Sequence, residues 1–259
     1  MACGAGRDAS RLDGDAAGTA TAWRHHPAMD RRAAEAILLS RGWLPDQPAD
    51  FQAALLAGAE PRHFRKGEVV FQAGDGPGGL YGIVAGSFGT YVSTPYSAPA
   101  LSHILHPGWW CGEGPALGGP KRVLTVRSME SSWAMHLPYE AARALVLSNP
   151  AAARSVGQLG QIAMRVAIAN VAQLMIRRAD RRIGAVLLRV TGALDEAALA
   201  PTGDIRLTQL EIARMANASR NLVNKSLAQF EAAGWVRLGY NRIAVLDSAA
   251  LADFAYQRG

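Results

Sequence analysis

The chain has 259 residues, of which 49% are hydrophobic and 19% charged, a balance typical of globular rather than disordered proteins. No run approaches the ~20 apolar residues that a membrane-spanning helix needs, and the N-terminus lacks the apolar core of a signal peptide. The chain has only two cysteines, Cys3 and Cys111, which argues against a disulfide framework and favours a reducing, cytoplasmic compartment. The net charge of +6 permits a polyanionic partner.

The composition and periodicity of the sequence change twice in the N-terminal half. Residues 1–30 are rich in Gly, Ala, Asp and Arg without periodicity, which predicts a disordered leader. Residues 31–148 begin with two expected helices, at 32–41 and 50–59, and continue as short apolar runs separated by glycines. Many short strands with frequent turns predict an antiparallel β-roll of the jelly-roll type. The strands are expected at 69–71, 80–84, 88–92, 101–105, 124–127 and 132–137.

A short helix at 139–147 precedes a long one, expected from about 151 to 179 in a dimerisation segment at 149–179. One apolar stripe of the long helix comprises Leu159, Ile162, Val166, Ala169 and Ile176, with Gln173 interrupting it, and a second comprises Met164, Ile168, Val171 and Met175. Two stripes indicate two buried faces, one against the chain's own domain and one against a partner helix. A single well-buried core helix is the alternative interpretation.

Residues 180–259 carry the clearest motif. Thr208 and Glu211 have the spacing of a capping box, which predicts the start of a helix. Asn217 lies in the tight turn that follows, and asparagine tolerates the left-handed conformation that such turns often need. Ser219 is a good N-cap for a second helix, and Gly234 a good terminator. This organisation is that of a helix-turn-helix.

The second helix is expected to be amphipathic. At ~100° per residue, Val223, Leu227 and Phe230 share one face. Polar residues gather toward the N-terminal half, the part of a recognition helix that reads the major groove. Arg and Lys can address guanine, Asn can address adenine, and hydroxyls can bind phosphate. The predicted DNA contacts are Thr208, Gln209, Ser219, Arg220, Asn221, Asn224, Lys225 and Arg242.

A hairpin is expected after this helix, with strands at 236–238 and 243–246. It would form a wing that places Arg242 near a phosphate. Six basic residues lie between positions 205 and 245, namely Arg206, Arg214, Arg220, Lys225, Arg237 and Arg242, against the acidic Glu211 and Glu231. The pattern and the local charge together predict duplex DNA as the partner. The alternative is an ordinary helical hairpin with a solvated polar face.

Taken in order, these segments resemble the CRP/FNR family of transcription regulators. The likeness covers roughly residues 50–250 and is carried by FRKGEVVFQAGD, LYGIVAGSFGTYV, Gly112-Glu113, Arg122 and LTQLEIARMANASRNLVNKSLAQFEAAGWV. It implies an α+β chain with a β-roll resembling a cyclic-nucleotide-binding domain, a long dimer helix and a C-terminal winged helix-turn-helix. It also implies a homodimer that reads a near-palindromic operator, with RNA polymerase as a further partner.

By the same resemblance, Arg220, Asn221 and Lys225 occupy the family's base-reading positions. Asn221 and Lys225 differ from the commonest family choices, Glu and Arg. The resemblance therefore implies the docking mode but not the target sequence.

The resemblance further implies an effector site in the β-roll. In cyclic-nucleotide responders a Gly-Glu pair binds the ribose and an Arg-Ser pair the cyclic phosphate. Gly112, Glu113 and Arg122 match, whereas Val123 replaces the hydroxyl and Pro115 lacks a backbone donor. Residues 167–168, Ala-Ile, align where cyclic-AMP responders have a polar pair facing the base. A cyclic nucleotide and a structural, ion-pairing role for Arg122 remain alternatives, and no cofactor is assigned.

Other chemistries find less support in the sequence. An FNR-type iron–sulfur cluster needs four cysteines, and Cys111 is better explained as a buried small hydrophobe than as a redox thiol. Nothing at His103, His106 or Cys111 points to haem, although a haem site is left open. A cupin-like metal-dependent enzyme could use His103, His106, Glu113 and His136, but a spacing of three is expected to put the first two on opposite strand faces.

A regulatory subunit that binds a ligand and signals through another protein is the second rival function. The basic recognition face argues against it. We expect no catalytic residue, no metal site, no membrane partner and no enzymatic activity.

Overall fold

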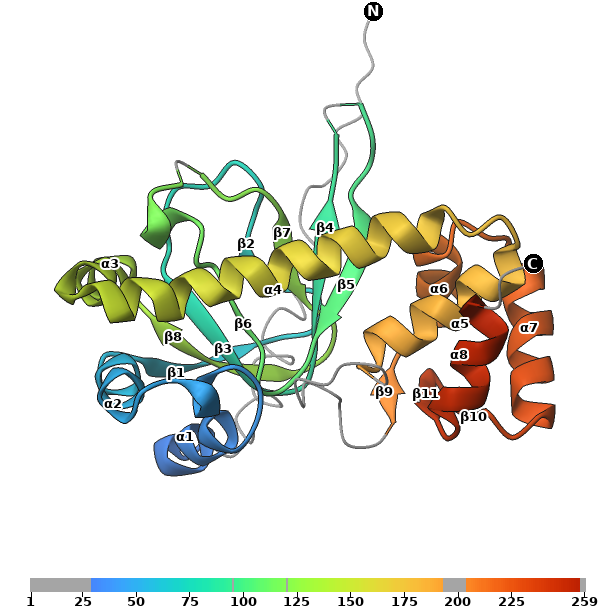
Figure 1. Ribbon diagram of the computed structural model, residues 1–259, viewed down its shortest axis with the longest axis horizontal. Helices are drawn as coiled ribbons and strands as arrows, with labels where there is room; N and C mark the ends of the chain where they lie inside the picture. Colours follow the sequence, from blue (N-terminus) through green and yellow to red (C-terminus); the bar gives the residue numbers. More distant parts are fainter. Residues whose placement is uncertain (1–28, 95, 120, 193–203, 257–259) are drawn as a thin grey trace, which may run out of the picture.

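The computed structural model describes residues 29–94, 96–119, 121–192 and 204–256. A β-roll and a C-terminal group of helices lie at opposite ends, and the long helix α4 (Pro150–Leu174) runs between them (Figure 1). No helix in these ranges is long and apolar enough to cross a membrane. The predicted disordered leader, 1–30, lies outside the described residues except for its last two positions.

The β-roll consists of two four-stranded antiparallel sheets. In order, one contains β1 (Glu60–Phe64), β8 (Ser132–Leu137), β3 (Leu80–Ala85) and β6 (Trp110–Cys111), and the other β2 (Val69–Phe71), β7 (Thr125–Ser128), β4 (Phe88–Val92) and β5 (Ala100–Leu105). Every predicted strand is confirmed to within one residue. The sequence missed β1, which contains Glu60, Pro61 and Arg62, and β6, which has only two residues. The antiparallel β-roll itself is confirmed.

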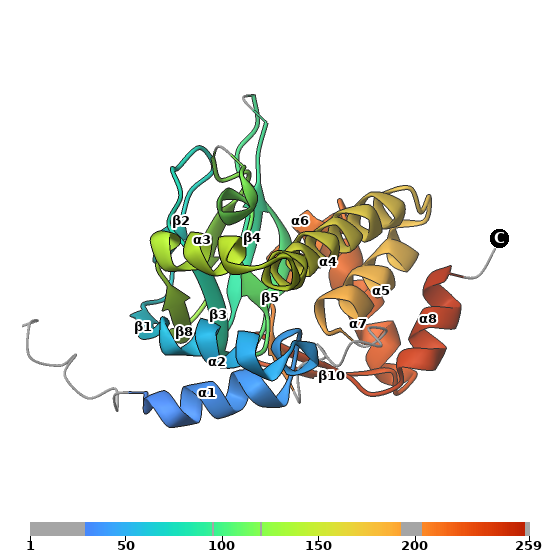
Figure 2. The same cartoon turned by 60° about the vertical axis from the view of Figure 1, so that its left-hand side comes forward.

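Helices cover the β-roll on the side away from the C-terminal group. These are α1 (Arg31–Ser40), α2 (Ala49–Ala57) and α3 (Tyr139–Ser148), with short 3₁₀ turns at Leu44–Asp46 and Pro115–Leu117. Figure 2 shows α1 and α2 side by side below the roll. Leu38, Leu44 and Leu55 are completely buried in a core that also contains Leu80 and Met135. The two predicted N-terminal helices are therefore confirmed and are fixed by apolar contacts with the sheet.

The C-terminal part contains the predicted helix-turn-helix and more. Its helices are α5 (Ala179–Val190), α6 (Gln209–Met215), α7 (Arg220–Ala232) and α8 (Ser248–Tyr256), and its sheet has the order β10 (Val236–Gly239), β11 (Arg242–Val245), β9 (Ile205–Arg206). The sequence analysis did not predict α5, α8 or β9. Buried Ile183 and Leu187 of α5 pack in one core with Leu227 of α7 and Leu251 of α8. The added helices supply the hydrophobic support that two short helices lack on their own.

The predicted end of the long helix is wrong. The helix was expected to reach residue 179, whereas α4 ends at Leu174 and Ala179 already begins α5. Arg178, between them, has extended backbone (φ −78°, ψ 120°). Apolar residues on both sides made the two helices look like one in the sequence, since periodicity alone does not show a change of axis.

Arg182 holds the joint between α4 and α5. Its Nη1 donates hydrogen bonds to the carbonyls of Ile176 (2.7 Å) and Arg177 (3.1 Å). Its Nε and Nη2 donate to the carbonyls of Ala216 (2.8 Å) and Asn217 (3.0 Å) in the turn between α6 and α7. One guanidinium thus satisfies carbonyls at the joint and in the helix-turn-helix, and it connects the two.

The two stripes of α4 have different surroundings. On the inner face, Leu159 and Gln173 are buried. The second stripe is exposed in the single chain: Met164 58%, Ile168 61%, Val171 61% and Met175 76%. The inner stripe is confirmed as a packed face, and the outer one is an apolar surface that this chain does not cover by itself.

The helix-turn-helix domain is packed against the β-roll. Leu101 and Ile104 of β5 and the neighbouring Met129 belong to the same core as Ile212 of α6. Arg242 of the hairpin lies 3.8 Å from the carboxylate of Glu130, between β7 and β8. The sequence, read segment by segment, did not indicate this contact between domains.

The joint generates a prediction. Replacement of Arg182 by methionine leaves four carbonyls without their charged donor and should lower the free energy of unfolding by about 2–3 kcal/mol, given that hydrogen bonds to charged groups contribute ~1.5–3 kcal/mol. Urea denaturation followed by circular dichroism measures this. The control is Arg177→Met, at an exposed arginine in the same joint, which should change stability by less than ~0.5 kcal/mol. Equal effects of the two variants would contradict the role given to Arg182.

Candidate nucleic-acid interface and effector site

The capping box at the start of α6 is formed. The backbone N–H of Thr208 donates to Glu211 Oε2 (2.7 Å), and the backbone N–H of Glu211 donates to Thr208 Oγ1 (3.2 Å). The Thr208 hydroxyl also donates to Glu211 Oε2 (2.7 Å). Because this hydroxyl is engaged in both directions, Thr208 acts in the structure as a helix cap.

The turn between α6 and α7 has the predicted geometry. Asn217 adopts a left-handed conformation with φ 45°, and Ser219 caps α7 by accepting from the N–H of Leu222 (3.2 Å). Gly234, with φ 77°, follows the end of α7. Most residues with a side chain avoid a positive φ, whereas asparagine and glycine tolerate it. These two residues therefore help to set where α7 begins and ends.

The recognition helix α7 separates its two faces as predicted. Val223, Leu227 and Phe230 are each at most 1% exposed. On the other face Arg220, Asn221, Asn224 and Lys225 are all exposed. The side chains that can read bases thus lie together on the N-terminal half of α7. Figure 1 shows α7 at the end of the molecule away from the β-roll.

A hollow lies between α6 and α7 beside these residues. Leu210, Ala213, Arg214, Asn217, Ala218, Ser219 and Arg220 line it. Arg214 was not among the predicted DNA contacts, although it is exposed and shares the hollow with Ser219 and Arg220. Its place at the end of the first helix, within the basic segment, was the signal that could have identified it.

The hairpin β10–β11 has an exposed tip. Tyr240 is 95% exposed, and Asn241 adopts φ 53°. Arg242, predicted to contact phosphate, is exposed, lies 3.8 Å from the carboxylate of Glu130 and donates from Nη1 to the Asp204 carbonyl (3.2 Å). The structure therefore brings the α7 residues and Ser219 to one surface, with Gln209 exposed on the neighbouring helix, but leaves Arg242 beside the β-roll.

Of the predicted effector residues, Arg122 is buried and donates a hydrogen bond to Gly112. Arg122 donates from Nη1 to the Gly112 carbonyl (2.7 Å) and from Nη2 to the Gly79 carbonyl (2.8 Å), and its guanidinium carbon lies 4.2 Å from the centre of the Phe71 ring. Gly112 has φ 98°, and a Cβ there would lie 2.5 Å from the Gly79 carbonyl oxygen. Only glycine fits this approach, so Arg122 and Gly112 together join two turns of the roll.

Two family models match this chain. One, for the cyclic nucleotide-binding domain, matches residues 61–149, and the other, for the Crp-like helix-turn-helix domain, matches residues 181–254. Together they cover more than half of the chain, in the order seen in the fold. The chain belongs to the CRP/FNR family of transcription regulators. The predicted class is thereby confirmed, and the family is one of DNA-binding regulators rather than enzymes.

Individual proteins that resemble this chain in sequence or fold agree with this family assignment. A CRP-like cAMP-activated global transcriptional regulator of Mycobacterium tuberculosis is 29% identical over 203 residues, which make up 77% of this chain and 90% of the relative. The structure of FixK2 from Bradyrhizobium japonicum matches with a TM-score of 0.66 at 17% identity, covering 78% of this chain and 99% of that one. A CRP/FNR-family transcriptional regulator of Thermus thermophilus, TTHA1359, matches with a TM-score of 0.57 at 24% identity, covering 77% of this chain and 100% of that one. The solved structures establish the fold.

As a CRP/FNR protein, the chain departs from the nucleotide-binding pattern in its structure as in its sequence. Val123, in place of a hydroxyl residue, is 89% exposed. Pro115 begins a 3₁₀ turn just after Glu113. Arg122 was expected alternatively to form a structural ion pair, but it forms no salt bridge within the described ranges. Its hydrogen-bond partners are backbone carbonyls.

The candidate metal ligands do not come together. No group of three His, Cys, Asp or Glu residues that could hold a metal ion occurs in the described part of the chain. The expectation that His103 and His106 point to opposite faces is wrong, because β5 ends at Leu105 and both histidines line one cavity. They meet there without a carboxylate, so the cavity lacks the donor set of a cupin metal site.

The thiol of Cys111 yields a prediction. Burial raises the pKa of Cys111 to about 12, with a smaller contribution from Glu113. The thiol should therefore stay protonated at pH 8, where the reactive thiolate is scarce. In a Cys3→Ser variant, iodoacetamide at pH 8 should not label the native protein and should label it fully after unfolding in urea, as mass spectrometry measures. Rapid labelling of the folded protein would contradict this and restore a redox role for Cys111.

Proposed function

We propose that this CRP/FNR regulator acts as a homodimer that inserts two copies of α7 into successive major grooves of a near-palindromic operator. The observation that carries the proposal is the exposed cluster of Arg220, Asn221, Asn224 and Lys225 on the N-terminal half of α7. That end of a recognition helix meets base edges. Half-sites should lie about 34–36 Å apart, one turn of the double helix.

The contacts divide into two kinds. Arg220, Asn221 and Lys225 can form hydrogen bonds with base edges, with Asn suited to adenine and the cations to guanine. Ser219, Gln209 and the additional Arg214 border the hollow or lie beside it, where hydroxyl, amide and guanidinium groups suit phosphate oxygens. We retain Thr208 as the cap that positions α6. Arg242, half exposed beside Glu130, is a further proposed phosphate contact.

The dimer is proposed to form along α4. Its exposed stripe, Met164, Ile168, Val171 and Met175, is apolar over three turns and is suited to a second copy of itself. The division of the chain follows from this: a sensor part at 31–148, a dimer helix that ends at Leu174 rather than 179, and a DNA-binding part from there to the C-terminus. RNA polymerase is the further partner that control of transcription requires.

We propose that the β-roll responds to an effector other than cyclic AMP, although a relative is named for its activation by that nucleotide. The hydroxyl expected beside Arg122 is absent, and both terminal nitrogens of Arg122 are engaged by carbonyls of Gly79 and Gly112. A cyclic phosphate would have to share Arg122 with these carbonyls, which take two of the five N–H donors of the guanidinium and leave its buried Nε–H without a partner in the described part of the chain.

In-vitro selection of duplex DNA by the purified protein tests the central claim. A palindromic site should be enriched equally with and without cyclic AMP, and its affinity should fall steeply with salt because phosphate contacts release counterions. Lys225→Ala should relax preference at one base position by roughly 1–3 kcal/mol. Uniform weakening across all sequences would show that Lys225 contacts phosphate. No enrichment under either condition would contradict DNA binding by the protein as purified, and enrichment only with cyclic AMP would overturn the effector proposal.

The dimer has its own test. Ile168→Glu places a charge in the centre of the exposed stripe and should convert the dimer to a monomer at micromolar concentration, as analytical ultracentrifugation measures. Ala163→Glu, at an exposed position of the same helix outside the stripe, is the control and should remain dimeric. A wild-type monomer, or a dimer unaffected by Ile168→Glu, would rule out this interface.

A further inference from the structure

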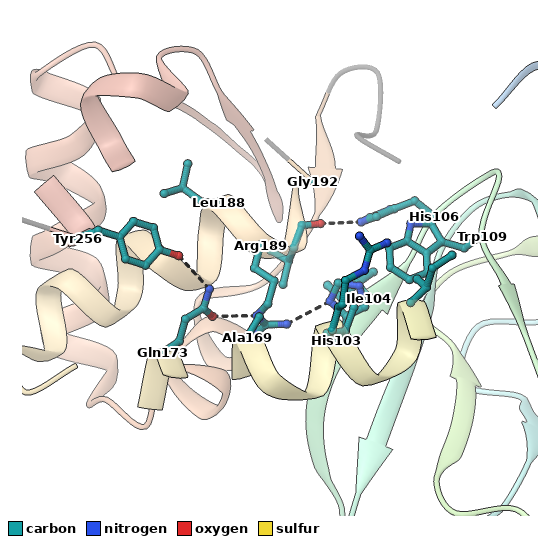
Figure 3. A pocket seen from close by; sticks show the side chains of 14 residues that line it. His103, Ile104, His106, Trp109, Ala169, Gln173, Leu188, Arg189, Gly192 and Tyr256 are labelled. Atoms are coloured by element: carbon teal, nitrogen blue, oxygen red, sulfur yellow. Dashed lines mark hydrogen bonds between the residues drawn. The ribbon is translucent and has the colours of Figure 1, made fainter. Parts of the chain in front are cut away.

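A cavity of about 240 Å³ lies where the β-roll, α4 and the C-terminal helices meet (Figure 3). Its lining comes from β5 and the turn after it, from the inner face of α4, from the end of α5 and from the last residue described in α8. The cavity is separate from Gly112, Glu113 and Arg122, none of which lines it. It is somewhat smaller than typical sites for drug-sized molecules, so it suits a small ligand.

One wall carries a partly buried cation, Arg189, that has no acidic partner among the described residues. Arg189 donates from Nε to Gln173 Oε1 (2.8 Å), and from Nη1 to the Ser102 carbonyl (2.9 Å) and His103 Nδ1 (3.0 Å). No hydrogen bond of its Nη2 and no salt bridge of its guanidinium occurs within the described ranges. Burial lowers the pKa of Arg189 to about 10, so the group remains charged at neutral pH. A partly buried charge without a counter-ion is costly, and an anion would relieve that cost.

Beside it, His103 offers an unused donor. Because a guanidinium can only donate, His103 Nδ1 must accept from Arg189, which puts the ring proton of the neutral form on Nε2. His103 is 4% exposed, and its Nε2 has no partner. Burial, followed by the nearby Arg189 and His106, holds the pKa of His103 well below its ordinary value, which keeps the ring neutral. A buried N–H without an acceptor, on a residue that lines a cavity, could be satisfied by a ligand oxygen.

The remaining lining completes a consistent chemistry. Tyr256 accepts from Gln173 Nε2 (3.2 Å), which leaves its own hydroxyl proton available, and Arg165 adds an exposed cation. The rest of the lining is mainly apolar, with Ile104, Trp109, Ile162, Val166, Ala169, Leu188 and Val190, and no Asp or Glu is among the lining residues. Donors and cations at one part and hydrocarbon elsewhere match a molecule with an anionic head and an apolar body.

We propose that this cavity is a binding site for a small organic carboxylate, whose carboxylate contacts Arg189 and the His103 Nε2–H and whose apolar body contacts Trp109 and the inner face of α4. Arg165 and the Tyr256 hydroxyl stand at the same site as further donors. Binding is independent of the proposed function. That the ligand modulates DNA binding rests on it, and follows because the cavity wall is shared by the sensor, α4 and the helices that support α7.

Isothermal titration calorimetry at pH 7.5 tests binding with octanoate and benzoate as probes, against octanamide and benzamide as neutral controls of the same shape. At least one acid should bind saturably at one site per chain, and its amide should bind at least about 10-fold more weakly, as expected on loss of a charge-assisted hydrogen bond. Absence of saturable binding by both acids, or equal affinity for acid and amide, overturns the proposal.

Two variants locate the site. Ala169→Leu fills the cavity from α4 and should abolish binding, whereas Ala163→Leu adds the same side chain at an exposed position of the same helix and should leave the affinity unchanged. Arg189→Met should lower the affinity by about 10- to 100-fold, and if that variant does not fold, the alanine pair decides. Binding that survives Ala169→Leu places the ligand elsewhere and overturns the assignment.

DNA binding is then measured on wild-type protein and Ala169→Leu, each with and without the acid that binds. A change in operator affinity with acid in the wild-type protein alone supports modulation through the cavity. An acid that binds without changing operator affinity leaves the site in place and rejects its regulatory role. Operator binding with no acid binding overturns the site alone, and acid binding with no operator binding contradicts the proposed function alone.

Discussion

Helix α4 has to bury two opposite faces, and a single chain can bury only one of them. Its inner face, with Leu159 and Gln173, is covered by the β-roll and α5, while Met164, Ile168 and Val171 remain more than half exposed. Exposed apolar surface of this extent is unfavourable in water. The position of α7 relative to α4 then depends on the hydrogen bonds of Arg182 at the joint and on the apolar core that α5 and α7 share. An element that supports both the β-roll and the recognition helix is thereby suited to transmit a change from one to the other.

The polar residues on the inner side of this joint are unusual for a protein core. Gln173 interrupts an apolar stripe, and in the structure it binds the Ala185 carbonyl, Tyr256 and Arg189 at once. Polar groups in such a place are costly unless each is satisfied. Most are satisfied here, and the exception, His103 Nε2, lies beside the charge that has no counter-ion. The region where the domains meet therefore has a defined hydrogen-bond network, and it lacks an acceptor for His103 Nε2 and a counter-ion for Arg189 among the described residues.

The β-roll illustrates how one fold can keep an architecture and change its site. Gly112 and Arg122 match the family pattern, yet in this chain they bind one another and Gly79. The close approach of Gly112 to Gly79, which only glycine permits, and the stacking of Arg122 on Phe71 give both residues a packing role, while the buried Nε of Arg122 has no partner in the described ranges. Matching residues thus carry the fold, while function depends on which of their polar atoms are still available.

Local signals in the sequence determined much of this protein. Periodicity, glycine spacing and the Thr208–Glu211 cap were sufficient to predict most strands, α6, α7 and the exposed face of α7, because residue alternation, turn residues and caps can be recognised within a few residues even where a strand pairs with a distant one. The family resemblance extended these segments to the correct architecture. Strands without β-forming residues, such as β1, and the helices α5 and α8 were missed, since partners far away in the sequence stabilise them.

Only the tertiary structure decided three further matters. Arg182 binds carbonyls some 35 residues away and ends what looked like one long helix. Arg242, exposed on the hairpin, lies near Glu130, more than a hundred residues earlier in the chain. His103, Gln173 and Arg189 meet in one cavity from three separate elements. In each case a charged or polar side chain contacts a partner that is far away in the sequence and close in space. The spacing of residues along the chain does not show such contacts.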